Sequence, residues 1–217
     1  MSLQVVSFTT YLTDTDGVAW RRDDYNARDF VLTIKDRDIR EYAFVRCRGQ
    51  RRRFENSTRE EVVGWFGEMV AEYCQEHPID MPFVLVPVPG SKADTRFANV
   101  QRTTTLAEAI AGALRPAPLV LDVLRWDSPI VSSRLLAGTR DVAALYARLV
   151  LTGSVFGQRV VLVDDVVTLG GHLRACAAKL RNAGADVVLG VCVARADPIP
   201  ASDPFAVRCE TLPDFVP

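Results

Sequence analysis

The chain has 217 residues, of which 48% are hydrophobic and 24% charged, and its formal net charge is −1. Such a composition is typical of a globular protein with one substantial α/β domain and a small appendage. The near-neutral charge argues against nucleic acid or an anionic membrane as partner. The five cysteines are widely spaced and form no C-x-x-C pair, which argues against a disulfide framework and a zinc knot.

The sequence lacks the apolar segments that direct a protein into or across a membrane. The sequence has no run of 18 apolar residues, and its first residues lack a basic segment followed by an apolar stretch. We therefore expect no membrane-spanning helix, no secretory signal and a cytoplasmic location, with the cysteines acting as small core residues.

Residues 1–80 are expected to form an N-terminal region of short strands and one helix. The runs Phe30–Ile34 and Tyr42–Val45 resemble strands, and the helix that follows them should end before Pro78. The basic cluster Arg51–Arg53 in this region is either a solvated loop or a contact for a phosphate or a partner.

From residue 81 onward apolar runs alternate with helical patterns, which predicts a mostly parallel sheet flanked by helices over residues 81–196. Residues 197–217 are expected to be an irregular C-terminal tail. Ligands of such sheets bind at the carboxyl ends of the strands. The expected strands are Phe83–Val88, Leu119–Leu124, Val160–Val163 and Val187–Val193, and the expected helices are Leu106–Leu114, Asp141–Leu149 and His172–Ala183.

The segment Val160–His172 has the sequence VVLVDDVVTLGGH and carries the most specific chemistry. A buried strand delivers two adjacent carboxylates, Asp164 and Asp165, to its carboxyl end. The glycine-containing loop that follows leads directly into a helix, whose N-terminus favours anions. An anion cradle beside two carboxylates suits a ligand with a phosphate at one end and hydroxyls nearby, such as ribose 5-phosphate.

This segment resembles the motif for phosphoribosyl pyrophosphate (PRPP) in type I phosphoribosyltransferases, closest in layout to orotate phosphoribosyltransferases and ComF-like proteins. The resemblance implies that Asp164 and Asp165 are catalytic residues that contact the ribose hydroxyls. It implies also that a loop wraps the 5-phosphate, mainly through backbone N–H groups, and that residues 1–80 form a hood over the nucleobase. The loop residues are Thr168, Leu169, Gly170, Gly171 and His172.

Two other segments match the family's layout. Gly90, Ser91 and Lys92 follow the first core strand, where the family places its pyrophosphate loop. The polar stretch 126–139 lies where the family has a mobile loop, and the candidate cations near it are Arg125, Arg134 and Arg140.

The phosphate loop departs from the family's usual Thr-Thr-Gly-x-Thr pattern, because Leu169 and His172 replace hydroxyl donors. His172 either donates to the phosphate or begins the helix. Thr168 stands where purine-type members carry a carboxylate, which favours the orotate-like pattern.

The resemblance implies transfer of phosphoribose from PRPP to a nucleobase or related nitrogen acceptor with release of pyrophosphate. Mg²⁺ would be held mainly through PRPP, with no direct protein ligand, and a homodimer is expected. The alternative is a non-catalytic module of the same fold that senses PRPP or a nucleotide, because fold alone does not determine activity. The altered phosphate loop favours the sensor, and the intact acid pair favours the enzyme.

Overall fold

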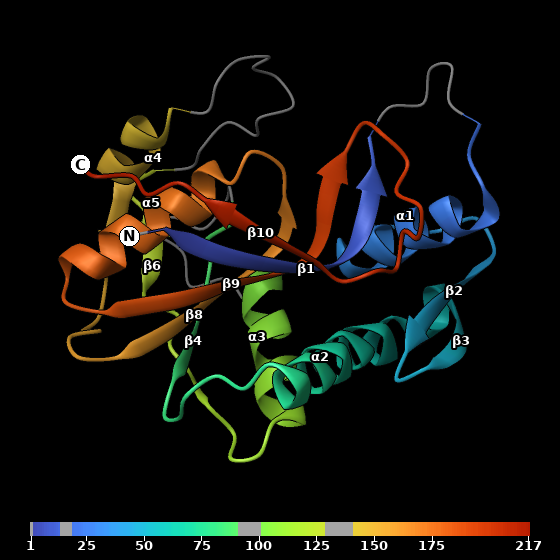
Figure 1. The fold of residues 1–217 in the computed structure, drawn as a ribbon, viewed down its shortest axis with the longest axis horizontal. Helices are drawn as coiled ribbons and strands as arrows, with labels where there is room; N and C mark the ends of the chain where they lie inside the picture. Colours follow the sequence, from blue (N-terminus) through green and yellow to red (C-terminus); the bar gives the residue numbers. More distant parts are fainter. Residues whose placement is uncertain (1, 14–18, 91–100, 129–140) are drawn as a thin grey trace.

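A computed structural model describes residues 2–13, 19–90, 101–128 and 141–217. Within these ranges six strands form the main sheet in the order β10-β1-β9-β8-β4-β5 (Figure 1). Neighbouring strands are parallel except for β1 and β10, so the predicted mostly parallel sheet is confirmed. The bounds are β1 Leu3–Leu12, β4 Val84–Pro87, β5 Leu119–Val120, β8 Arg159–Val167, β9 Asp186–Asp197 and β10 Arg208–Leu212.

The sheet is buried on both faces because its strands carry apolar residues on both sides of the pleat. Along β8, Val161 and Val163 face one core while Val160 and Leu162 face the other. The first core lies against α1 Arg22–Ile34, α2 Arg59–Glu76 and α3 Arg102–Ala113. The second lies against α4 Val142–Arg148, α5 Gly171–Asn182 and the small sheet of β6 Leu124–Trp126 and β7 Leu149–Leu151.

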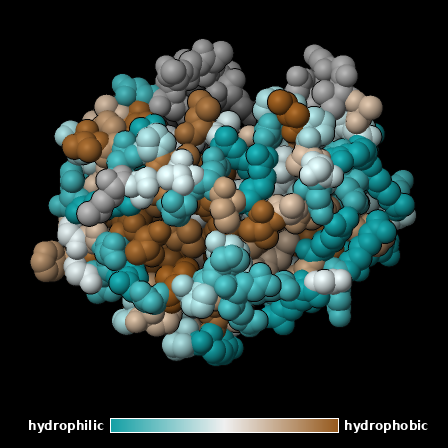
Figure 2. All heavy atoms as spheres, viewed as in Figure 1, coloured by the Kyte–Doolittle hydropathy of each residue, from teal (hydrophilic) through white to brown (hydrophobic). Residues whose placement is uncertain are grey.

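The hairpin of β2 Tyr42–Cys47 and β3 Gln50–Glu55 packs with α1 and α2 and, after the short turn η1 Asn56–Thr58, leads into α2. In Figure 1 α1 and the hairpin lie at the opposite end of the molecule from α4 and α5. Hydrophilic residues cover much of the face over the hairpin end, whereas more hydrophobic residues are visible over the sheet (Figure 2). No helix in the described ranges is long and apolar enough to cross a membrane.

The expected strand at Phe30–Ile34 is wrong, because these residues end helix α1. The helix begins with a capping box in which the backbone N–H of Arg21 donates to Asp24 Oδ2 at 2.8 Å. Ala27, Phe30, Val31 and Ile34 are buried together at helical spacing. Burial of this face outweighs the strand propensity of a short aromatic and β-branched run.

The first and last strands also depart from the predicted division of the chain at residues 80 and 197. β1 is an inner strand of the main sheet and pairs with β9, so the first strand is not part of the hood-like region. The C-terminal segment contains β10, which pairs with the other edge of β1. Both pairings join residues far apart in the chain, which local sequence patterns do not report.

Candidate functional site

The two carboxylates of the motif lie near the carboxyl end of β8, as the sequence predicted. β8 continues to Val167, beyond the expected end at Val163, so both acids belong to the strand. Asp164 Oδ1 accepts a hydrogen bond from the backbone N–H of Asp165 at 2.8 Å. Both residues are partly buried, and they lie at the carboxyl ends of the strands, where ligands of parallel sheets bind.

Asp165 has a cationic partner that the sequence did not reveal. Arg102, the first residue of α3, donates from Nη1 to Asp165 Oδ2 at 2.7 Å, and its Nη2 donates to the backbone carbonyl of Lys35 at 3.3 Å. The side chain of Arg102 is 42% exposed and that of Asp165 is 18% exposed, so solvent screens this ion pair. Arg102 therefore joins the acid pair to the end of α1.

The predicted phosphate loop connects β8 to the N-terminus of α5. Thr168 and Leu169 are exposed, whereas Gly170 and Gly171 are buried. Gly170 has a φ of 70°, the left-handed conformation that glycine adopts readily, and it precedes the first residue of α5. The loop thus places backbone N–H groups and a helix N-terminus beside the carboxylates. Arg195 donates to the carbonyl of Thr168 and so ties the loop to β9.

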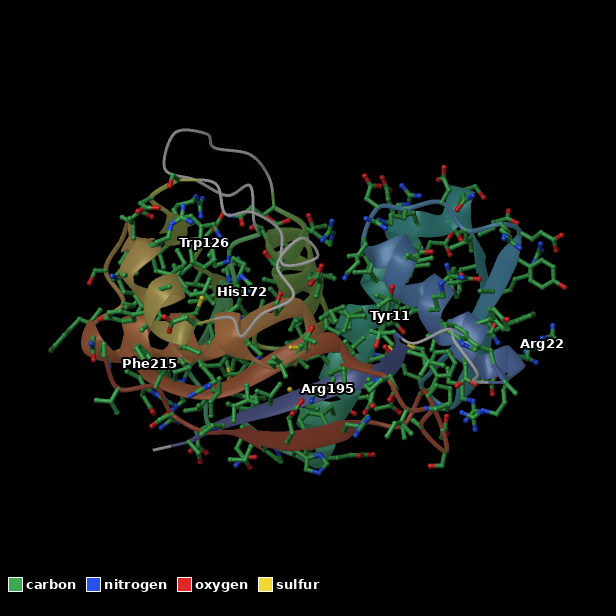
Figure 3. All side chains as sticks on the ribbon, turned by 90° about the horizontal axis from the view of Figure 1, so that it is seen from above. Tyr11, Arg22, Trp126, His172, Arg195 and Phe215 are labelled. Atoms are coloured by element: carbon green, nitrogen blue, oxygen red, sulfur yellow. The ribbon has the colours of Figure 1, made fainter. Side chains whose placement is uncertain are left out.

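A tryptophan joins the two predicted anion loops, and the sequence did not single it out for this. Trp126 is fully buried, and its Nε1 donates to the carbonyls of Pro89 at 3.2 Å and Gly90 at 3.0 Å. Its ring meets the His172 ring edge-to-face, with centroids 5.6 Å apart. Figure 3 shows Trp126 and His172 side by side at one end of the molecule. His172 is within helix α5 and packs against an aromatic ring, in agreement with the interpretation that it begins the helix.

The other candidate residues have more varied positions. The backbone N–H of Gly90 donates to Gln101 Oε1 at 2.9 Å, so its hydrogen bond is already used within the protein. Arg125 forms an ion pair with Asp122, to which Gln101 Nε2 also donates at 3.4 Å. These contacts hold Arg125 near the end of β5 rather than over the acid pair. Ser91, Lys92, Arg134 and Arg140 lie outside the described residues.

Two buried cysteines flank the acid pair. Burial raises the pKa of the Cys176 and Cys192 thiols well above the ordinary value, and the negative charge of Asp164 raises both further. Both thiols are therefore neutral at physiological pH and are poor nucleophiles. Cys47, Cys176 and Cys192 are small core residues, as the sequence predicted for all five cysteines, whereas Cys74 is partly buried and Cys209 is exposed.

Comparison with known proteins identifies structures but no sequence relatives. No family model matches the chain, and no curated protein matches it. Orotate phosphoribosyltransferase from Mycobacterium tuberculosis is 14% identical with a TM-score of 0.36, and the match covers 78% of this chain and 96% of that one. A phosphoribosyltransferase from Corynebacterium diphtheriae is 16% identical with a TM-score of 0.38, covering 79% and 96%.

A purine phosphoribosyltransferase from Pyrococcus horikoshii is 21% identical with a TM-score of 0.33, covering 63% of this chain and 87% of that one. The fold of this chain is thus similar to those of three solved phosphoribosyltransferases.

The donor atoms of the acid pair determine which metal ion this site could bind. Carboxylate oxygens suit Mg²⁺, which usually keeps several waters and is bound through one or two carboxylates together with substrate phosphates. In the part of the chain that the structure describes, no group of three or more His, Cys, Asp or Glu residues could hold a metal. The donors therefore fit an ion shared with a phosphorylated substrate rather than a metal held by the protein alone.

Proposed function

We propose that this protein binds PRPP at the carboxyl end of β8 and transfers its phosphoribosyl group to a nitrogen nucleophile, releasing pyrophosphate. One observation carries the proposal: Asp164 and Asp165 lie one short loop before the N-terminus of α5, and Gly170 at that terminus has the left-handed conformation. Carboxylates accept hydrogen bonds from sugar hydroxyls, and the helix N-terminus attracts a phosphate. PRPP carries both groups on one ribose.

In the proposed reaction the residues of this chain mainly bind and orient. Asp164 and Asp165 accept hydrogen bonds from the ribose hydroxyls, while backbone N–H groups from Leu169 to His172 hold the 5-phosphate. The bond between C1 of the ribose and the pyrophosphate oxygen breaks, the bond from C1 to the acceptor nitrogen forms, and the pyrophosphate departs with the electron pair. Mg²⁺ bound through PRPP would supply charge stabilisation to the pyrophosphate. The fixed sugar geometry lowers the barrier by proximity and orientation.

The second candidate is a module that binds PRPP or a nucleotide without turnover. The altered phosphate loop favours it, because Leu169 is an exposed side chain without a hydrogen-bond donor. In both candidates a bound ribose or pyrophosphate would have to share or replace the hydrogen bonds of Asp165 with Arg102 and of the Gly90 N–H with Gln101.

Isothermal titration calorimetry with PRPP, with and without Mg²⁺, tests the shared first step. Binding that strengthens with Mg²⁺ is expected, and no binding in either condition would refute the enzyme and a module that senses PRPP. Pyrophosphate release against a panel of nucleobases then separates them. We expect release with at least one base; PRPP binding without release from any base would instead favour the sensor.

The Asp165→Asn variant tests the position of the ligand. It removes a charged acceptor, and a hydrogen bond to a charged group contributes about 1.5–3 kcal/mol, so affinity for PRPP should fall about 10- to 100-fold. Asp186→Asn is the matched control. Asp186 begins β9, so it lies at the opposite ends of the parallel strands from the acid pair, and it forms a solvent-exposed ion pair with Arg159. Affinity should be unchanged in this control, and an unchanged affinity in Asp165→Asn would place PRPP elsewhere.

A further inference from the structure

A cavity lies at the hairpin end of the molecule, among three segments that are far apart in sequence. The start of α1, the β2–β3 hairpin and residues 202–205 line a volume of about 560 Å³, within the range of small-molecule sites. We call it the arginine pocket. Its lining contains four arginines against two aspartates: Arg21, Arg22, Arg46 and Arg51 against Asp23 and Asp203.

Two of the four arginines hold the pocket together. Arg46 of β2 bridges Asp23 of α1, at 3.1 Å, and Asp203, at 2.8 Å. Arg21 pairs with Asp24 at 2.8 Å and donates to the carbonyl of Ser202 at 2.8 Å. The carboxylates around the pocket are therefore used by these two arginines, and the three segments are fixed to one another.

The other two arginines form no ion pair with a carboxylate among the described residues. Arg22 and Arg51 are both exposed. Both guanidinium groups lie over the ring of Phe44, with Arg51 at 4.0 Å and Arg22 at 5.7 Å from its centroid. Each of the two cations is therefore positioned at the pocket by the same ring. Guanidinium groups bind phosphate oxygens in a bidentate manner, so an anion here would gain charge-assisted hydrogen bonds.

The arginine pocket is separate from the acid pair. Arg22 begins α1, whereas Lys35, which caps its other end, accepts the hydrogen bond from Arg102. The 13 residues of α1 span about 20 Å between these ends. Figure 3 shows Arg22 at the opposite end of the molecule from Trp126 and His172. A ligand in the pocket would therefore not occupy the site proposed for PRPP.

From these contacts we infer that the arginine pocket is a second anion site, which takes a phosphate monoester of nucleotide size that contacts Arg22 and Arg51. The volume admits a base and a sugar, and two cations without a carboxylate partner among the described residues complement the charge of a phosphate monoester. The cluster Arg51–Arg53 lies in strand β3 and not in a loop, and the inference gives Arg51 the other predicted role, a phosphate contact. This inference does not depend on catalysis at the acid pair.

Backbone NMR of the full-length, ¹⁵N-labelled protein tests the inference in 0.15 M salt. The probes are adenosine 5′-monophosphate and adenosine, which differ only by the phosphate group. We expect saturable shifts of the amide signals of Arg22, Phe44, Arg51, Ser202, Asp203 and Phe205 with the monophosphate, and none with adenosine. Following these signals separates the arginine pocket from any binding at the acid pair.

The variant Arg22→Gln/Arg51→Gln should weaken the monophosphate at least 10-fold as judged from these signals. Arg53→Gln is the matched control, because Arg53 is in the same strand as Arg51, is paired with Glu55 and does not line the pocket. The control should bind as the wild type does. The inference is overturned if the pocket signals do not saturate, if adenosine shifts them equally, if the double variant binds normally, or if the control is weakened as much.

Discussion

Gly170, which caps the N-terminus of α5 in the candidate phosphate loop, offers a test of the structure around the site. Gly170 has a φ of 70°, and a Cβ at this position would lie 2.3 Å from Leu212 Cδ1 and 3.2 Å from its Cγ. Gly170→Ala therefore carries two costs. A non-glycine residue in the left-handed conformation costs about 1–2 kcal/mol, and overpacking against a buried side chain costs about 1–3 kcal/mol.

Gly157 provides the matched control, because it also has a φ of 70° but a Cβ there would meet no atom within 4 Å. Gly157→Ala should lose only the conformational part, about 1–2 kcal/mol. Urea denaturation measures both losses as shifts in midpoint at constant slope. The Gly170→Ala variant should lose about 1–3 kcal/mol more than the control. Equal losses would refute the packing of β10 against the loop and with it the described position of Leu212.

Two further predictions concern groups near the site. Trp126→Phe keeps an aromatic ring but removes the donor to the carbonyls of Pro89 and Gly90. The free energy of unfolding in urea should fall by about 1 kcal/mol, and the affinity for PRPP in calorimetry should fall as well. Unchanged values of both would show that this hydrogen-bonded link is not needed. The thiols of Cys176 and Cys192 have pKa values raised by burial, so the stability that they contribute is present below the unfolded-state pKa and is lost as pH rises above it. The free energy of unfolding should fall above about pH 8.5 by up to about 1.4 kcal/mol per pH unit for each thiol. In the Cys176→Ala/Cys192→Ala variant this free energy should fall less steeply with pH. An equal slope in wild type and variant would contradict the raised pKa values of the two thiols.

Features that depend on neighbouring residues could be predicted from the sequence. The continuous apolar runs before Gly90 and before Asp164 indicated strands buried on both faces, and the two cores confirm this for β4 and β8. The helix predicted at His172–Ala183 and the strand predicted at Tyr42–Val45 correspond to α5 and β2, since periodicity and glycine positions are local properties. The order of acid pair, glycine loop and helix lies within 13 consecutive residues, so the candidate site was visible without the fold.

Contacts between distant segments were decided only by tertiary structure. Local propensity made Phe30–Ile34 look like a strand, although burial against the sheet makes it the end of α1. The ion pair of Arg102 with Asp165 joins residues 63 positions apart, and the Trp126 link to Gly90 joins residues 36 apart. The arginine pocket likewise unites Arg22 with Asp203. A sequence pattern reports each segment's own periodicity and charge, whereas the pairing of two segments depends on the free energy of the whole packed chain.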